Sequence, residues 1–170
     1  IVQDLDRVVG LDVLASKLRY LRQRCGALVQ GSVFDLPFAD ESFDGVVCSQ
    51  VVEHIAGGAR PFEELARVLK PGGLAVVGTP DYGRPYWPAI ERAYKWAHPN
   101  GYADEHITHY SLASLREVLG RAGFEVLRHE YIVGAELNVL ARRARSRPSI
   151  AFTTSSVPTA SFSRSPSSET

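Results

Sequence analysis

Methionine is absent from this chain of 170 residues, and cysteine occurs only twice, at Cys25 and Cys48. So few cysteines give no disulfide framework and no cysteine-based zinc pattern. No apolar run approaches the roughly 20 residues of a membrane-spanning helix. The 19 acidic residues balance the 19 basic ones, so no overall field draws the chain to nucleic acid or to an anionic membrane. We therefore expect a cytoplasmic protein without a nucleic-acid or membrane partner, and its oligomeric state stays open.

Short apolar runs alternate with helical patterns along most of the chain, which is typical of an α/β fold with a parallel sheet. We expect strands at residues 8–12, 27–30, 44–49, 74–79, 124–127 and 136–141. Helices are expected at residues 14–24, 61–69, 89–97 and 112–122, the last with Ser111 as its N-cap. The final two strands predict an antiparallel hairpin at the edge of the sheet.

Two segments depart from this rhythm. Residues 81–110 are rich in aromatic side chains and predict a lid-like insertion over the carboxyl ends of the strands. From residue 146 onward serine, threonine and proline dominate without a period, which predicts a disordered tail. The expected organisation is one domain over residues 1–145, with the insertion inside it, and a tail over residues 146–170.

Polar residues follow the expected strands at the points where ligands bind in open α/β sheets. Asp12 closes the first strand, and Asp35 lies on a turn after the second. The segment 49–54, read Ser-Gln-Val-Val-Glu-His, follows the third. We expect these side chains to share one rim of the sheet.

The order and spacing of these segments resemble the class I methyltransferases that depend on S-adenosyl-L-methionine (SAM), in particular the type 11 group. The resemblance covers residues 7–143 and implies a Rossmann-like methyltransferase sheet. The motifs that carry it are, in order, Val9-Gly10-Leu11-Asp12, Asp35-Leu36-Pro37-Phe38, Ser42-Phe43-Asp44, Glu53-His54, Leu69-Lys70-Pro71-Gly72-Gly73 and Ala122-Gly123-Phe124.

This resemblance implies a role for each rim residue. Asp12 would accept hydrogen bonds from both ribose hydroxyls of SAM, and Asp35 would accept from the adenine amine. Leu36 would offer backbone groups and an apolar edge to the ring, while Ser49 and Gln50 would touch the methionine part. The alternatives are structural: a helix-capping Asp12, an Asx-turn acid at Asp35, and a plain helix start at Ser49.

Three histidines are candidates for taking a proton from the methyl acceptor, because the free imidazole titrates near neutrality. They are His54 beside Glu53, and His106 and His109 in the insertion. Each could instead be structural, bonded to backbone or packed in the lid. No metal site is expected, because a third ligand with clear spacing is missing. The aromatic residues of the insertion could line a pocket for a ring-shaped acceptor.

The implied activity is transfer of a methyl group from SAM to a small-molecule acceptor, which requires in-line alignment and exclusion of water. The family's first strand and glycine-rich loop are not found, and nothing in residues 1–7 replaces them. We therefore expect the carboxyl-terminal part of a longer methyltransferase, incomplete and possibly inactive by itself. Two alternatives remain open: a non-catalytic SAM-fold interaction module, and a nicotinamide-dependent oxidoreductase, since an acid at a strand end also serves NAD-binding folds.

Overall fold

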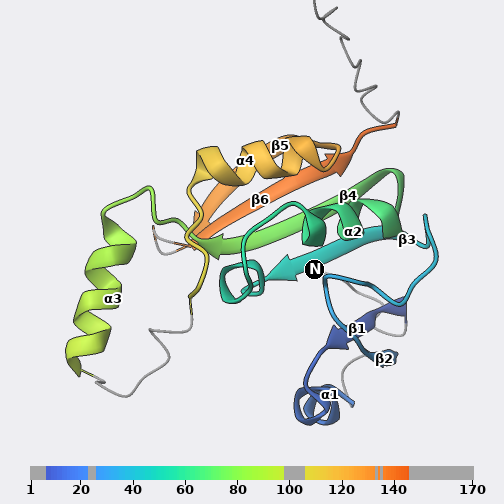
Figure 1. Ribbon diagram of the computed structural model, residues 1–170, viewed down its shortest axis with the longest axis horizontal. Coiled ribbons are helices and arrows are strands. Elements are labelled where there is room, and N and C mark those ends of the chain that lie inside the picture. Colours follow the sequence, from blue (N-terminus) through green and yellow to red (C-terminus); the bar gives the residue numbers. More distant parts are fainter. Residues whose placement is uncertain (1–6, 23–25, 98–105, 133, 135, 146–170) are drawn as a thin grey trace, which may run out of the picture.

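The computed structural model describes residues 7–22, 26–97, 106–132, 134 and 136–145. Cys25 and the expected tail, residues 146–170, lie outside the described residues. Within them the chain is an α/β structure with two sheets (Figure 1). Its elements are β1 (Val9–Asp12), α1 (Ala15–Leu21), β2 (Ala27–Gln30), β3 (Phe43–Ser49), the 3-10 turn η2 (Val52–His54), α2 (Arg60–Val68), β4 (Leu69–Pro80), α3 (Tyr86–Ala97), α4 (Leu112–Arg121), β5 (Phe124–Ile132) and β6 (Glu136–Arg143).

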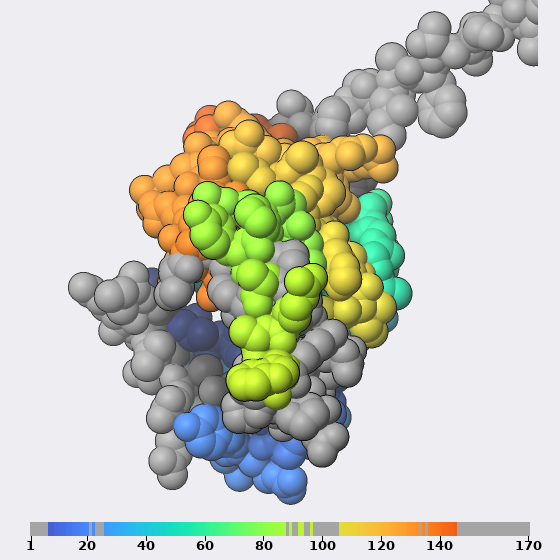
Figure 2. Space-filling model, turned by 90° about the vertical axis from the view of Figure 1, so that its left-hand side faces the viewer, coloured from blue at the N-terminus to red at the C-terminus, as the bar shows by residue number. Residues whose placement is uncertain are grey.

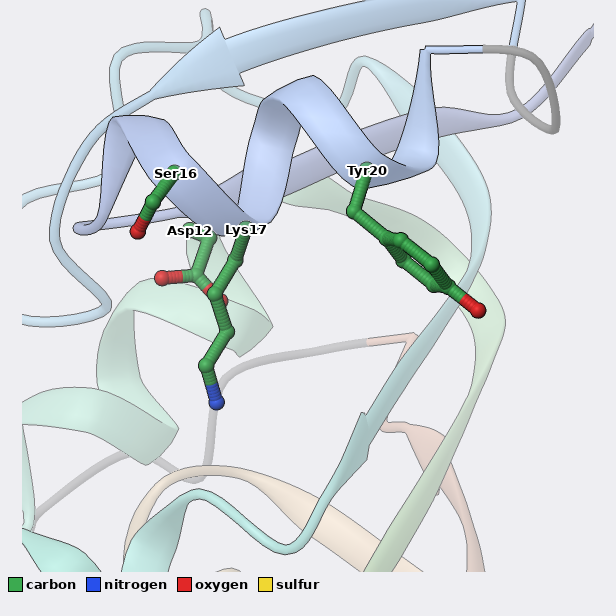
Figure 3. A pocket seen from close by; sticks show the side chains of 4 residues that line it. All are labelled: Asp12, Ser16, Lys17 and Tyr20. Atoms are coloured by element: carbon green, nitrogen blue, oxygen red, sulfur yellow. The ribbon is translucent and has the colours of Figure 1, made fainter.

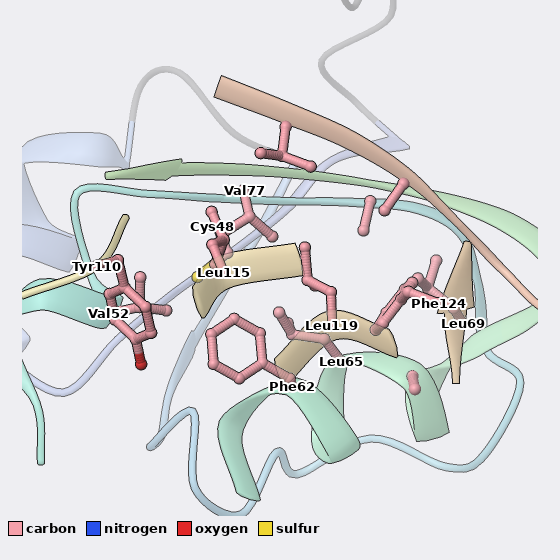
Figure 4. Packing of buried hydrophobic residues seen from close by; sticks show 14 of the residues in the cluster. Cys48, Val52, Phe62, Leu65, Leu69, Val77, Tyr110, Leu115, Leu119 and Phe124 are labelled. Atoms are coloured by element: carbon pink, nitrogen blue, oxygen red, sulfur yellow. The ribbon is translucent and has the colours of Figure 1, made fainter. Parts of the chain in front are cut away.

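The larger sheet has the strand order β3-β4-β6-β5, with β3 parallel to β4 and the other pairs antiparallel. This confirms the predicted parallel sheet with an antiparallel hairpin at its edge. Every second residue of the two central strands is fully buried, and α2 and α4 bring their apolar stripes against that face (Figure 4). The fully buried side chains of this core include Phe62, Leu69, Ala75, Val77, Leu115, Leu119, Leu137, Val139 and Ala141. We call this part, from β3 to β6, the four-stranded body.

The smaller sheet pairs β1 with β2 in parallel, with Asp12 opposite Gln30, and α1 connects the two strands. In this β1–α1–β2 unit, Leu18 is the one buried hydrophobic residue among the side chains that the structure describes, and it is 8% exposed. The unit lies below the four-stranded body in Figure 1 and shares no ladder with it. Among the described residues, the inner edges of β1 and β3 thus have no strand partner, as expected when a strand between them is lacking.

Several element boundaries differ from the sequence-based expectation. β4 begins at Leu69 and not at residue 74, because a register shift lets Leu69 pair with Phe43 and Leu74 with Gly45. Pro71 and the two glycines after it therefore lie in an irregular strand. α3 begins at Tyr86, three residues early, and Pro88 falls in its first turn, where a missing N–H is tolerated. β5 runs to Ile132, well past the expected residue 127.

The predicted N-cap of α4 is confirmed. The Ser111 hydroxyl accepts a hydrogen bond from the Ser114 backbone N–H at 3.2 Å, and the Ser114 hydroxyl accepts from the Ser111 N–H at 2.9 Å. This capping box fixes where the chain returns from the insertion to the body. No helix in the described part of the chain is both long enough and apolar enough to span a membrane.

Candidate active site

Asp12 lies at the end of β1, as predicted, and one oxygen of its carboxylate already accepts a hydrogen bond from the backbone. Its Oδ1 accepts a hydrogen bond from the Leu14 backbone N–H at 2.8 Å, so it supports the turn into α1. This is the structural role that we had set beside ribose binding. A carboxylate has about four acceptor positions, so one backbone bond leaves capacity for vicinal hydroxyls.

An open hollow of about 360 Å³ lies beside Asp12 (Figure 3). Three side chains of α1, those of Ser16, Lys17 and Tyr20, complete its lining. A carboxylate, a hydroxyl, an ammonium group and a phenol together offer both donors and acceptors to a polar ligand. This set fits the hydroxyl-bearing part of a nucleoside such as that of SAM.

Asp35 is exposed on a tight turn that follows β2. Its N–H donates to the Ser32 carbonyl at 3.2 Å, and these two residues form an isolated antiparallel bridge. Because β1 and β2 are parallel, their carboxyl ends, and with them Asp12 and the turn of Asp35, lie at the same edge. Asp12 and the turn that carries Asp35 therefore follow the same edge of the β1–β2 pair.

Leu36 is held differently from the expectation. Its side chain is 7% exposed and belongs to the core. Its N–H donates to Glu64 Oε2 at 2.8 Å, and its carbonyl accepts from Arg67 Nη2 at 2.8 Å. Both backbone groups that we had assigned to adenine are thus engaged by α2. This correction follows from α2 packing against the loop, a contact that the local sequence does not reveal.

Glu64 and Arg67 fix the loop that carries Asp35, and the sequence reasoning missed both. They form an ion pair at 2.8 Å, and Arg67 Nη1 also donates to the Phe38 carbonyl at 2.8 Å. Arg60, one helical turn before Glu64, donates to the Phe34 carbonyl at 3.0 Å. The hydrogen bond from Arg67 holds the pKa of the buried Glu64 carboxyl below its usual value. Their i, i+3 spacing on one helix was the available signal.

Ser49 and Gln50 lie at the end of β3, as predicted, and both are exposed. Gln50 adopts a left-handed backbone conformation with φ 57°, which is uncommon for a residue other than glycine. Its N–H donates to the Gly78 carbonyl at 3.0 Å. A Cβ at Gly78 would lie 2.5 Å from the Ser49 hydroxyl, so the close approach of β3 and β4 at this rim requires glycine.

Glu53 is the buried acid of the rim, and the sequence had presented it only as the neighbour of His54. It is fully buried in η2, and neither carboxylate oxygen has a hydrogen-bond partner in the part of the chain that the structure describes. The nearest ionisable atom recorded beside it is His54 Nε2, 3.9 Å from Oε1. Burial raises the pKa of this carboxyl above its ordinary value, while the neighbouring His54 and the buried Thr79 hydroxyl act in the opposite direction.

Backbone bonds bring His106 to the same place. The carbonyl of Glu53 accepts from the Ile107 N–H at 2.8 Å and from the Thr108 N–H at 3.0 Å, so the return of the insertion is fastened to η2. The rings of His54 and His106 lie 4.9 Å apart between centroids, edge to face. Two of the three predicted histidines therefore meet, although 52 positions separate them in the sequence.

Tyr82 links His106 to the third histidine. Its hydroxyl lies 2.8 Å from His106 Nδ1, and its ring stacks on His109 at 3.9 Å between centroids and 13° between planes. Trp87 lies edge-on to Tyr82 at 6.4 Å. The Tyr82 N–H also donates to the Tyr110 carbonyl at 2.8 Å, which closes the base of the insertion. Tyr82 and Trp87 thus lie together with the histidines, whereas Tyr86 and Trp96 of α3 are exposed. The helix α3 projects away from the sheet in Figure 1 and faces the viewer in Figure 2.

A parallel strand pair with an acid at the end of β1, beside a sheet with an antiparallel edge hairpin, is typical of a Rossmann-like α/β protein. A solved structure of a SAM-dependent methyltransferase from Thermotoga maritima superimposes with a TM-score of 0.65 at 21% identity, over 79% of this chain and 72% of that one. A family model described as a methyltransferase domain matches residues 1–77. Together with the relatives described next, these matches support a class I SAM-dependent methyltransferase family for the chain, as the motifs predicted.

Curated relatives agree with this family. A probable S-adenosylmethionine-dependent methyltransferase of Mycolicibacterium smegmatis is 33% identical over 122 residues, 71% of this chain. A 2-phytyl-1,4-naphtoquinone methyltransferase of Thermosynechococcus vestitus is 27% identical over 154 residues, 75% of this chain. The matches cover 44% and 65% of these two relatives, so the chain spans about half to two thirds of their length.

Proposed function

We propose that this protein transfers a methyl group from SAM to a small-molecule acceptor. The observation that carries the proposal is the pair of carboxylates, Asp12 and Asp35, at the same edge of two neighbouring parallel strands in a chain of this family. SAM supplies a methyl group already activated on a positively charged sulfur. The protein must therefore bind, orient and exclude water.

Each rim residue binds a different part of SAM. Asp12 accepts from the ribose hydroxyls with the acceptor capacity that the Leu14 bond leaves, and Asp35 accepts from the exocyclic amine of adenine. Ser49 and Gln50, exposed at the end of β3, meet the methionine part. Leu36 is no longer assigned to the cofactor, because α2 engages its backbone groups.

The acceptor binds beside His54, His106 and His109: the His54 ring contacts that of His106, and Tyr82 contacts both His106 and His109. One of these histidines takes up the proton of an ionisable acceptor group. Aromatic side chains border them, which suits an apolar, ring-shaped molecule, and one relative is named for a naphthoquinone-type acceptor. We place the protein in the cytoplasm, because Cys48 is a buried free thiol and the cysteine content is low.

We further propose that a strand lies between β1 and β3 in the whole protein, so that this chain alone is an incomplete domain. Two features support this proposal: the inner edges of β1 and β3, which are unpaired among the described residues, and the exposure of Val47. Val47 is 71% exposed in the middle of β3, an unusual position for a strand valine. We expect the chain by itself to bind SAM weakly or not at all, and so to behave as a non-catalytic module.

Substitution of Asp12 tests the function. In a protein that includes the proposed strand, Asp12→Ala should weaken binding of S-adenosylhomocysteine by about 10- to 100-fold, because hydrogen bonds to a charged group are lost. Calorimetric titration measures the affinity, and mass spectrometry detects the methylated product. Asp44→Asn is the control, since Asp44 lies at the opposite end of β3 and pairs with Lys70. Unchanged affinity in Asp12→Ala would contradict the proposal, and binding without any product would favour the non-catalytic module.

A further inference from the structure

We propose that Glu53, His54 and His106 bind a divalent metal ion, whose remaining coordination positions take an oxygen atom of the methyl acceptor. One ligand atom from each residue lies within 4.8 Å of the other two. A carboxylate with two imidazoles is a donor set that first-row ions such as Zn²⁺ and Co²⁺ accept. The claim that these residues bind an ion does not depend on the proposed function, whereas the claim that the ion binds the acceptor rests on it.

The buried carboxylate is the main reason for this proposal. Glu53 is 0% exposed, and its two oxygens have no hydrogen-bond partner among the described residues. Burial of an unpaired carboxylate is strongly unfavourable, and a bound cation removes this penalty. The 3.9 Å between Glu53 Oε1 and His54 Nε2 exceeds a hydrogen bond but suits two ligands of one ion.

The surroundings of His106 support the same site. The Tyr82 hydroxyl lies 2.8 Å from His106 Nδ1, so we assign the ion to Nε2, the other ring nitrogen of His106. A histidine that binds a metal usually has its other nitrogen fixed by such a partner. Tyr82 is therefore a positioning residue.

The geometry requires only a small contraction. Two ligands at about 2.2 Å from one ion are at most about 4.4 Å apart, slightly less than the widest separation here. Two of the three ligands adjoin on η2, and the backbone bonds from residues 107 and 108 to the Glu53 carbonyl hold the third beside them. His54 is 36% exposed at its side chain, so an ion can enter from that side.

Titration with ZnCl₂ and CoCl₂ tests the site, with calorimetry, thermal unfolding and the visible absorption of Co²⁺ as readouts. Wild type should bind one ion, gain thermal stability and give a Co²⁺ spectrum typical of nitrogen and oxygen ligands. His54→Ala and His106→Ala should lose these signals. His109→Ala, the matched control on the other side of Tyr82, should keep them. Tyr82→Phe should weaken binding by about 10- to 100-fold.

Glu53→Gln separates a metal ligand from a merely buried acid. The variant should bind no Co²⁺ yet remain folded without metal, because it removes a buried charge. Retained Co²⁺ binding in Glu53→Gln or in the double variant His54→Ala/His106→Ala would overturn the proposal, as would absence of binding to wild type. Binding of S-adenosylhomocysteine, measured separately, tests the cofactor rim and does not depend on this result.

Discussion

The four-stranded body and the β1–α1–β2 unit differ in how completely they bury their hydrophobic side chains. The body has a continuous core in which Phe62, Leu115 and Leu119 are fully buried, whereas the unit's best-buried hydrophobic residue, Leu18, is 8% exposed. The body carries the histidine cluster, and the unit carries Asp12 at its end with Asp35 just beyond it. The side proposed for the acceptor therefore has a hydrophobic core of its own, while the position of the proposed nucleoside side depends on the residues that pack between β1 and β3.

Core truncation is the strongest way to test this difference. Leu115→Ala should lower the free energy of unfolding by about 3 to 5 kcal/mol, because it leaves a cavity in a close-packed core. Leu18→Ala should cost only about 1 kcal/mol, since its surroundings are open. Urea unfolding followed by circular dichroism measures both. Equal losses would show that the two regions are packed alike.

The link between the regions is the Glu64–Arg67 pair, which fixes the loop after β2 to α2. Glu64→Gln should cost about 3 kcal/mol near neutral pH, because it breaks a buried ion pair. The pKa of Glu64 is lowered, so its stabilisation is present above the unfolded value of about 4.3 and is lost as the pH falls through the lower folded value.

The difference in stability between wild type and Glu64→Gln should therefore be constant from neutral pH down to about 5 and shrink on further acidification. Glu63→Gln is the control, since Glu63 is the exposed neighbour on the same helix. Denaturant titrations over this pH range check both variants. A difference that persists in strong acid would mean that the Glu64 charge does not stabilise the loop.

The smallest expected effect concerns Cys48, whose reactivity measures how often β3, the edge strand of the four-stranded body, opens. Burial raises the pKa of this thiol to about 12, so hardly any thiolate forms at pH 8. In a Cys25→Ser background, a disulfide reagent should modify Cys48 only at the rate of unfolding. Rapid modification under native conditions would show that β3 opens locally, and the contrast between the two regions would then weaken.

The sequence predicted those parts of the molecule that local pattern decides. Residues 27–30 form the strand that their apolar run predicted, and Ser111 caps α4 because its hydroxyl and that of Ser114 are three residues apart. The early start of β4 was predicted wrongly, because pairing with Phe43 overrides the proline and glycines after Leu69. A bulge of this kind depends on a partner strand that no local rule describes.

The site divides in the same way. Asp12 and Asp35 could be placed from the sequence because one ends its strand and the other follows the next, and their role toward SAM stays a prediction. The engagement of Leu36 by Glu64 depends on contacts 28 residues apart, and the meeting of Glu53 with His106 joins η2 to the end of the insertion. Such convergence requires the fold, so the sequence showed Glu53 beside His54, and His106 near His109, without indicating which residue would be a third ligand.

The most direct test is a crystal structure with S-adenosylhomocysteine bound, in a protein that includes a strand between β1 and β3. We predict ribose hydroxyls within hydrogen-bond distance of the Asp12 carboxylate and the adenine amine beside Asp35. A nucleoside bound elsewhere, with Asp12 contacting only the Leu14 N–H, would contradict the account.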